Sequence, residues 1–290
     1  MSALVEAIGE DFTLTGSGRY LKTFEHDSFV IDTERDIFFW NSKGIVGDLF
    51  TYLTKIRGMS VKEAYIAKIE DRNDLLKSYD IVEEKNKNSI VVYPELVDIF
   101  YEYGRNNRQL WYNRGYTDKT IDKFKLGFEG KWYVIPIFEE SKFVNFQMRM
   151  ENPRMMSTWY KISDGHTFNF SMLPVTDFVI LTEGPVDAIM LSQYGIPAVS
   201  QTAGSGNIDI YRKHFNKFNN IQKIYICYDN DKAGQSGSLK VARLFGNKAR
   251  VYNFWDFDEK YDVGDFFKEG NTKDAFISLV EEKGKAWYEL

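Results

Sequence analysis

The sequence has little of several residues whose presence would suggest particular chemistry. It contains one cysteine, Cys227, three histidines and 6 prolines among 290 residues. A single cysteine excludes a disulfide framework within the chain and a zinc site built on two or more cysteine thiolates. No run of about 18 apolar residues is present, as a membrane span requires, and Met1–Glu10 lacks the pattern of a signal peptide. We therefore expect a cytoplasmic protein without membrane contact.

Charge is unevenly distributed along a chain whose composition, 43% hydrophobic and 27% charged, is that of a folded protein. At roughly 100–200 residues per domain, the length corresponds to about two domains. The formal net charge is -5, which by itself predicts no polyanionic partner. Residues 105–161, however, carry 11 basic and 6 acidic side chains. This segment is a candidate for binding nucleotides or nucleic acid, although solvated faces often show a similar imbalance.

Patterns of strand and helix divide the first part of the chain. In residues 1–82, FVIDTERDIFFW predicts two short strands around a polar turn and GDLFTYLTKI a helix, which together form a small β-plus-helix module. A charged stretch with few large apolar residues predicts a linker over residues 83–92. Residues 93–177 begin with helices, including one that Thr117 caps, and continue with the strands KWYVIPIF and KFVNFQMRM. This third segment is a mixed, locally basic subdomain.

Strands and helices alternate in the last segment, residues 178–290. FVILTEG, IPAVSQT, KIYICYDND and ARVYNFW read as strands, and the segments between them read as helices. Such alternation predicts a mostly parallel sheet covered by helices, so this segment is α/β and the whole chain is α+β. Ligands of such sheets bind beyond the carboxyl ends of the strands.

Acidic residues stand at these strand ends. Glu183 closes the first strand, Asp229 and Asp231 close the third, and Asp262 and Asp265 follow the fourth. Neighbouring carboxylates repel and raise one another's pKa unless a hard cation such as Mg²⁺, which prefers oxygen ligands, neutralises them. Each acid alone also fits a helix N-cap or a solvated turn, and for Asp231 this alternative is equally good. Together the acids favour a metal site.

Three of these motifs resemble a known domain. TEGPVDAI, YDNDKAG and YDVGDFFKEG, within residues 178–270, resemble the Toprim domain shared by bacterial-type primases, topoisomerases and some nucleases. Upstream, YNRGYTDKTIDKFKLGF, VIPIF, NFQMRM and WYKIS resemble the basic subdomain that precedes Toprim in the bacterial and phage DNA primase family. Residues 26–64 resemble that family's zinc-ribbon module and its trailing helix. The order of the segments is that of a primase and not of a topoisomerase.

The sequence departs from the primase pattern in three respects. Trp40, Ser42 and Lys43 stand where the family's zinc ribbon has Cys and His ligands, so we expect this module to fold without zinc. Aromatic residues are expected to close it instead: Phe29, Phe38, Phe39 and Trp40. Asp262 and Asp265 are one position further apart than the family's two aspartates. The chain ends soon after the Toprim match, so a replicative helicase, if one is recruited, is expected to act in trans.

The resemblance implies template-directed synthesis of RNA primers on single-stranded DNA from ribonucleoside triphosphates, for replication of a phage or mobile replicon. It assigns catalysis and the binding of Mg²⁺ or Mn²⁺ to Glu183, Asp229 and Asp231. Further candidate metal ligands are Asp187, Asp262 and Asp265, although Asp187 also fits an acid favoured at a helix N-terminus. Candidates for binding nucleotide or template, at positions where primases keep basic residues, are Arg114, Arg149 and Lys161.

Two other functions fit the same motifs. A Toprim nuclease would use the same metals to let water, instead of a ribose hydroxyl, attack phosphorus. A non-catalytic accessory protein would bind single strands without turnover, although the intact acids Glu183, Asp229 and Asp231 argue against it. Primer synthesis from nucleotides distinguishes the first reading from both alternatives.

Overall fold

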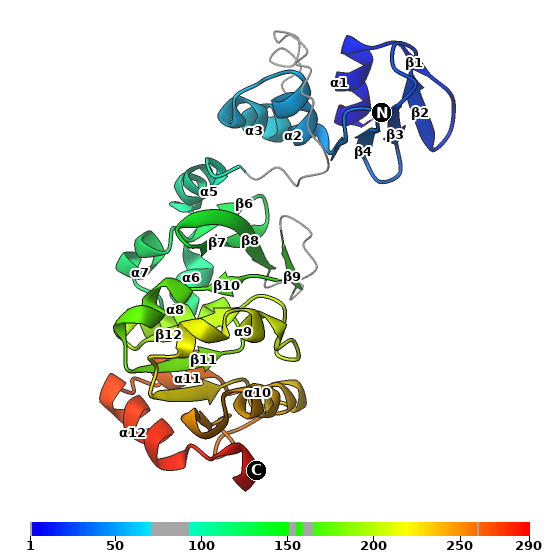
Figure 1. Cartoon of the computed structure of the whole chain (residues 1–290). Helices are drawn as coiled ribbons and strands as arrows, with labels where there is room; N and C mark the ends of the chain where they lie inside the picture. Colours follow the sequence, from blue (N-terminus) through cyan, green and yellow to red (C-terminus); the bar gives the residue numbers. More distant parts are fainter. Residues whose placement is uncertain (1, 71–92, 151–154, 159–164, 260) are drawn as a thin grey trace. The chain divides into compact units, whose positions relative to one another are not determined.

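The computed structural model describes residues 2–70, 93–150, 155–158, 165–259 and 261–290. The chain forms two compact units, residues 1–99 and 100–290 (Figure 1). Helix α5 comprises Leu96–Gly104. The expected linker over residues 83–92 lies outside the described residues, and the finer division into a module, a linker, a basic subdomain and a Toprim domain stays a prediction. Within the described ranges, no helix has both the length and the apolar character needed to cross a membrane.

A five-stranded antiparallel sheet forms the centre of the first unit. Its strands follow the order of the chain: β1 (Leu14–Thr15), β2 (Tyr20–Thr23), β3 (Phe29–Asp32), β4 (Ile37–Trp40) and β5 (Ile45–Gly47). Helical segments flank it: α1 (Ala3–Asp11), α2 (Leu49–Thr51), a π-helical segment (Tyr52–Ile56) and α3 (Val61–Glu70). Strands β3 and β4 pair from Phe29 opposite Trp40 to Asp32 opposite Ile37, which confirms the hairpin read from the sequence.

Aromatic side chains fill one face of this sheet. Phe29, Phe38 and Trp40 are buried. The rings of Phe29 and Phe38 stack at 5.1 Å, and the Trp40 ring meets Phe29 edge-on at 4.8 Å. Phe39 does not join this cluster, because successive residues of a strand point to opposite faces and Phe39 lies on the more exposed one. The Lys43 ammonium lies 4.6 Å from the centre of the Trp40 ring, so a cation–π contact joins two of the positions at which zinc ligands were lacking.

The second unit begins with helices and an antiparallel sheet. After α5 come α6 (Gln109–Asn113) and α7 (Asp118–Lys123), and Thr117 caps α7 as predicted by accepting the Thr120 N–H. The sheet that follows has four strands in chain order: β6 (Gly127–Glu129), β7 (Trp132–Glu139), β8 (Lys142–Met150) and β9 (Met155–Thr158).

A second sheet, of order β10-β12-β11-β13-β14, completes this unit. Its strands are β10 (Thr167–Phe168), β11 (Phe178–Thr182), β12 (Ala198–Gln201), β13 (Lys223–Cys227) and β14 (Ala249–Val251). All pair in parallel except β10, which is antiparallel at the edge. The accompanying helices are α8 (Pro185–Gln193), α9 (Asp209–Lys213), α10 (Lys232–Phe245), α11 (Val263–Lys268) and α12 (Lys273–Lys283), with short 3₁₀ turns at Phe170–Val175, Phe215–Phe218, Gly246–Lys248 and Trp287–Glu289.

This arrangement confirms the α/β class expected for residues 178–290, with one local difference. The fourth strand was expected to extend through ARVYNFW, but β14 ends at Val251. Phe254 takes a left-handed backbone with a φ of 54°, which is incompatible with an extended strand.

The parallel strands are covered on both faces. Val179 and Leu181 of β11 belong to the core that includes residues of α9 and α10, whereas Ile180 belongs to the core that includes residues of α8, α11 and α12. Because both faces are buried, the strands are apolar at successive positions. Trp111 and Tyr116 join the second of these cores, so the α6–α7 segment packs with α8.

Candidate active site

A cavity of about 600 Å³ lies beyond the carboxyl ends of the parallel strands. Its walls come from α6 and the residue after it, β8, the start of α8, the turn after β13, and α11. The lining residues are Asn113, Arg114, Arg149, Met150, Val186, Asp187, Asp229, Asp231, Asp262, Asp265 and Lys268. Five aspartates and three cationic side chains therefore share one cavity.

The turn after β13 directs Asp229 and Asp231 to the cavity and Asn230 away from it. Asn230 is buried, and its Nδ2 donates to main-chain carbonyls of the segment after β14, at 3.1 Å for Phe254 and for Phe257. A Cβ at Gly234 would lie 2.3 Å from the Asp229 carbonyl oxygen. Glycine in the first turn of α10 therefore lets this helix begin directly against the turn that carries the two aspartates.

Two of the cavity aspartates are also helix N-caps. Oδ1 of Asp231 accepts the Gly234 N–H at 2.8 Å at the start of α10. Oδ1 of Asp262 accepts the Asp265 N–H at 2.9 Å at the start of α11. The capping role considered for Asp231 from the sequence is thus present, and it uses one of two carboxylate oxygens.

The surroundings of Asp187, in the first turn of α8, disfavour the ionised form of its carboxyl group. Burial raises the pKa of Asp187 well above its ordinary value, and the charges of Asp262 and Asp229 raise it further. The guanidinium groups of Arg114 and Arg149 lower it in part. A cation bound among these carboxylates would relieve the same repulsion.

Glu183 directly follows β11, but it is not part of the cavity lining. Its Oε2 is buried and has no hydrogen-bond partner. Burial raises the pKa of Glu183, the nearby Asp231 charge adds to this, and polar contacts from the Asp229 main chain and the Ser205 side chain oppose it. The structure therefore places Glu183 close enough to Asp231 for their charges to interact, at the margin of the cavity.

The donor chemistry of this region fits a divalent cation, although the ligands are not preassembled. Across the parts of the chain that the structure describes, no three His, Cys, Asp or Glu side chains are arranged to hold a metal ion. The carboxylates nevertheless supply only oxygen, as hard cations prefer, and Oε2 of Glu183 lacks a partner. Side-chain rotation would be needed to gather them, because the caps hold one oxygen each of Asp231 and Asp262.

Three cations face the carboxylates in this cavity. Arg114 follows α6, and its Nε is buried with no hydrogen-bond partner. Arg149 lies on β8. Lys268 was not among the residues expected from the sequence, and its ammonium lies 3.2 Å from the carboxylate of Asp265, three positions earlier on α11. The three-residue spacing between Asp265 and Lys268, which suits an ion pair on a helix, was the sequence signal that could have identified Lys268. Lys161, the third basic candidate, lies outside the described residues.

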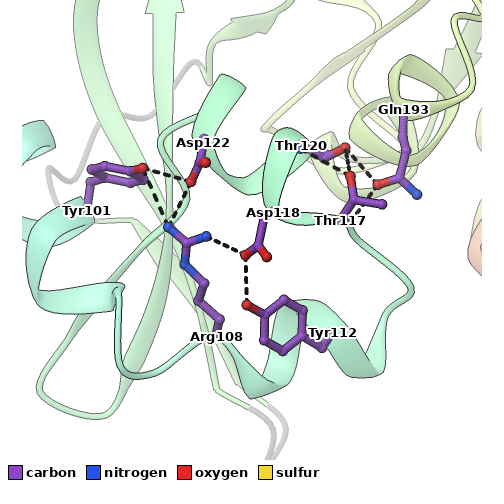
Figure 2. Close-up of polar contacts among 8 residues, drawn as sticks. All are labelled: Tyr101, Arg108, Tyr112, Thr117, Asp118, Thr120, Asp122 and Gln193. Atoms are coloured by element: carbon purple, nitrogen blue, oxygen red, sulfur yellow. Dashed lines mark hydrogen bonds and ion pairs between the residues drawn. The ribbon is translucent and has the colours of Figure 1, made fainter.

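An ion-pair network holds α6 and α7 together (Figure 2). Arg108 donates to Asp118 at 2.6 Å and to Asp122 at 2.8 Å. Two tyrosine hydroxyls donate to the same carboxylates, Tyr112 to Asp118 and Tyr101 to Asp122, both at 2.7 Å. These hydrogen bonds lower the pKa of Asp118 and Asp122, so both carboxylates are ionised at neutral pH. The loop between the two helices, which begins with Arg114, is thereby held at both ends.

Comparison with known proteins shows what this sequence and fold are similar to. Residues 180–267 match a family described as Toprim-like. A DNA primase of Clostridium acetobutylicum is 24% identical over 97% of this chain, which covers 57% of that relative. A DNA primase of Chlamydia trachomatis is 21% identical, with coverage of 83% and 51%. The solved zinc-binding and RNA polymerase domains of the Aquifex aeolicus primase superpose with a TM-score of 0.56 at 20% identity, covering 98% of this chain and 83% of that one.

Residues 180–267 carry the Toprim-like match, and the similarity along the whole chain, in sequence and in fold, supports a bacterial- and phage-type DNA primase family. The family expected from the sequence is thereby confirmed. The chain spans about half the length of the curated primases it matches, 57% and 51%.

Proposed function

We propose that this chain synthesises RNA primers on single-stranded DNA from ribonucleoside triphosphates by divalent-metal-dependent nucleotidyl transfer. The observation that carries the proposal is the single cavity that combines five aspartates with Arg114, Arg149 and Lys268. Similarity to DNA primases along 97% of the chain supports the same reaction.

Toprim primases in general depend on divalent metal ions, and we assign Mg²⁺ or Mn²⁺ to this site. The residues proposed to hold the metal are Glu183, Asp229 and Asp231, with Asp187, Asp262 and Asp265 as further ligands. When bound, the metal neutralises charge on the phosphate oxygens during an in-line displacement at phosphorus.

Cationic side chains would bind and orient the nucleotide. A guanidinium contacts two phosphate oxygens at once, and the unpartnered Nε of Arg114 is available for such a contact. With its carboxylates ionised, the cavity has more negative than positive groups and repels a triphosphate. We therefore expect nucleotide to bind tightly only together with the divalent metal.

The partners follow from the same proposal. Residues 1–82 would contact the template without zinc, and Lys161 would join Arg149 in binding nucleotide or template. We assign the reaction to replication of a phage or mobile replicon in the cytoplasm, with a replicative helicase as a further partner.

Incorporation of labelled ribonucleotides on single-stranded templates, with and without Mg²⁺, tests the proposal. Metal-dependent primers that disappear in Asp229→Asn would support it, and the matched control is Asp209→Asn, which removes an exposed charge on α9. Template cleavage without extension would identify a nuclease instead. Template binding with neither reaction would identify an accessory protein.

A further inference from the structure

Gln193, the last residue of α8, binds the loop between α6 and α7 with both ends of its side-chain amide. Its Oε1 accepts the Thr117 N–H at 2.8 Å and the Thr120 hydroxyl at 2.7 Å (Figure 2). Its Nε2 donates to the Gly115 carbonyl at 2.9 Å. Two of these bonds reach main-chain atoms of Gly115 and Thr117, so they determine the path of the backbone directly after Arg114.

The same loop is seated closely on the elements that carry the cavity. Gly115 has a φ of 85°, and a Cβ there would lie 3.5 Å from Cε of Met190 on α8 and 3.7 Å from Cγ of Lys268 on α11. The Tyr116 hydroxyl donates to the Val186 carbonyl at 2.6 Å. Glycine supplies the left-handed backbone of this turn without strain. Gln193 thus completes a docking contact between the α6–α7 loop and α8.

Arg114 is the side chain that this loop presents to the cavity. Its guanidinium lowers the pKa of Asp187, which places its charge beside the acidic wall. Its Nε is buried and has no hydrogen-bond partner. A buried guanidinium N–H without an acceptor is unfavourable, and an anionic oxygen of a bound ligand would satisfy it.

We propose that Gln193 is a positioning residue that sets the Arg114 guanidinium against the phosphate oxygens of a nucleoside triphosphate. This inference rests on the proposed function. A glutamine amide suits the position, because its oxygen accepts from Thr117 and Thr120 while its nitrogen donates to the Gly115 carbonyl. A glutamate would retain both acceptor contacts, but at neutral pH it would place a carboxylate against the Gly115 carbonyl.

The test is a double-mutant cycle with Gln193→Ala, Arg114→Ala and the double variant, measured as kcat and KM for nucleotide and as direct binding of a labelled triphosphate with Mg²⁺. Gln193→Ala should raise KM and weaken binding by about tenfold, because misplacement of a binding group by about an ångström is costly. The double variant should be no weaker than Arg114→Ala, since without the guanidinium its placement has no effect. Gln193→Glu should fall between wild type and Gln193→Ala.

Lys273→Ala is the matched control. Its ammonium donates to the Gly195 carbonyl at 3.0 Å, at the same end of α8 but away from the α6–α7 loop, so KM should not change. If the effects of Gln193→Ala and Arg114→Ala on KM and triphosphate binding are additive, the inference is wrong while the proposed function stands. The same conclusion follows if Gln193→Ala is less stable but has unchanged KM and binding. If wild type makes no primers, the proposed function fails and the cycle is read from triphosphate binding alone. In that case, non-additive losses of triphosphate binding in Gln193→Ala and Arg114→Ala support the positioning role. Equal binding by wild type and Gln193→Ala, or no binding by either, refutes it.

Discussion

Asp231 accepts the N–H of Gly234 at 2.8 Å, so one carboxylate both caps α10 and lines the acidic cavity. The two roles use different properties. A cap needs an oxygen acceptor, which an amide also supplies, whereas a cation site needs negative charge. Substitutions at this position therefore separate folding from chemistry.

Asp231→Asn should retain the cap and the stability of the fold while abolishing nucleotide incorporation. Asp231→Ala should lose activity and also about 1 kcal/mol of unfolding free energy, because Ala cannot cap. Chemical denaturation and the incorporation assay on the same preparations check both variants. Normal turnover in Asp231→Asn would remove this residue from the proposed metal site.

A zinc-selective chelator, added with Mg²⁺ kept in excess, should leave the stability of the full chain unchanged, since aromatic packing around Trp40 closes the first sheet. Trp40→Ala should lower the unfolding free energy by about 3–5 kcal/mol. Phe39→Ala, on the more exposed face of the same strand, should cost less than about 1 kcal/mol and serves as the control. Stoichiometric zinc in the purified protein, or unfolding on chelation, would contradict the prediction.

Arg149→Ala should weaken binding of single-stranded DNA or nucleotide and flatten its salt dependence. For single strands, each lost phosphate contact reduces the slope of log K against log salt by about 0.7. Arg212→Ala removes a cation that is 59% exposed on α9 and should leave the slope unchanged. Lys161→Ala is expected to behave like Arg149→Ala. Lost stability with unchanged binding would instead show that Arg149 is structural.

Acid should destabilise the contact between Glu139 and the start of β10. Glu139 accepts the Thr167 N–H at 2.8 Å, and His166 is the main cause that lowers the pKa of Glu139 from 4.5 to about 2. Because the folded pKa is the lower one, this stabilisation is complete above pH 4.5 and disappears as the pH falls toward 2. Because the Glu139 side chain is one-third exposed, we expect this contact to contribute about 1–2 kcal/mol to the free energy of unfolding.

Glu139→Gln should therefore be less stable than wild type at pH 7, and the two should converge as the pH falls toward 2. Denaturation curves at several pH values measure this difference. Glu140→Gln, at a side chain that is 79% exposed, is the neighbouring control and should follow wild type. Equal stability of wild type and Glu139→Gln at pH 7 would refute the assignment.

Local patterns were enough to predict much of this protein. The hairpin of β3 and β4, the Thr117 cap and the parallel strands follow from alternation, capping chemistry and apolar runs, all of which act over a few residues. The acids beyond the strand ends were likewise visible, because parallel strands bring their carboxyl ends to one edge. The primase family was recognisable from motifs of the same short length.

Tertiary packing decided how those side chains meet. Gln193 is 76 residues from Thr117 and 78 from Gly115, and no local pattern relates them. Lys268 lines the cavity because α11 packs near α8. Glu183 is not part of the lining, although it directly follows the central strand β11. Periodicity identifies which elements form and which face each one buries. The distances between side chains on different elements depend on how those elements pack, and only the folded chain determines them.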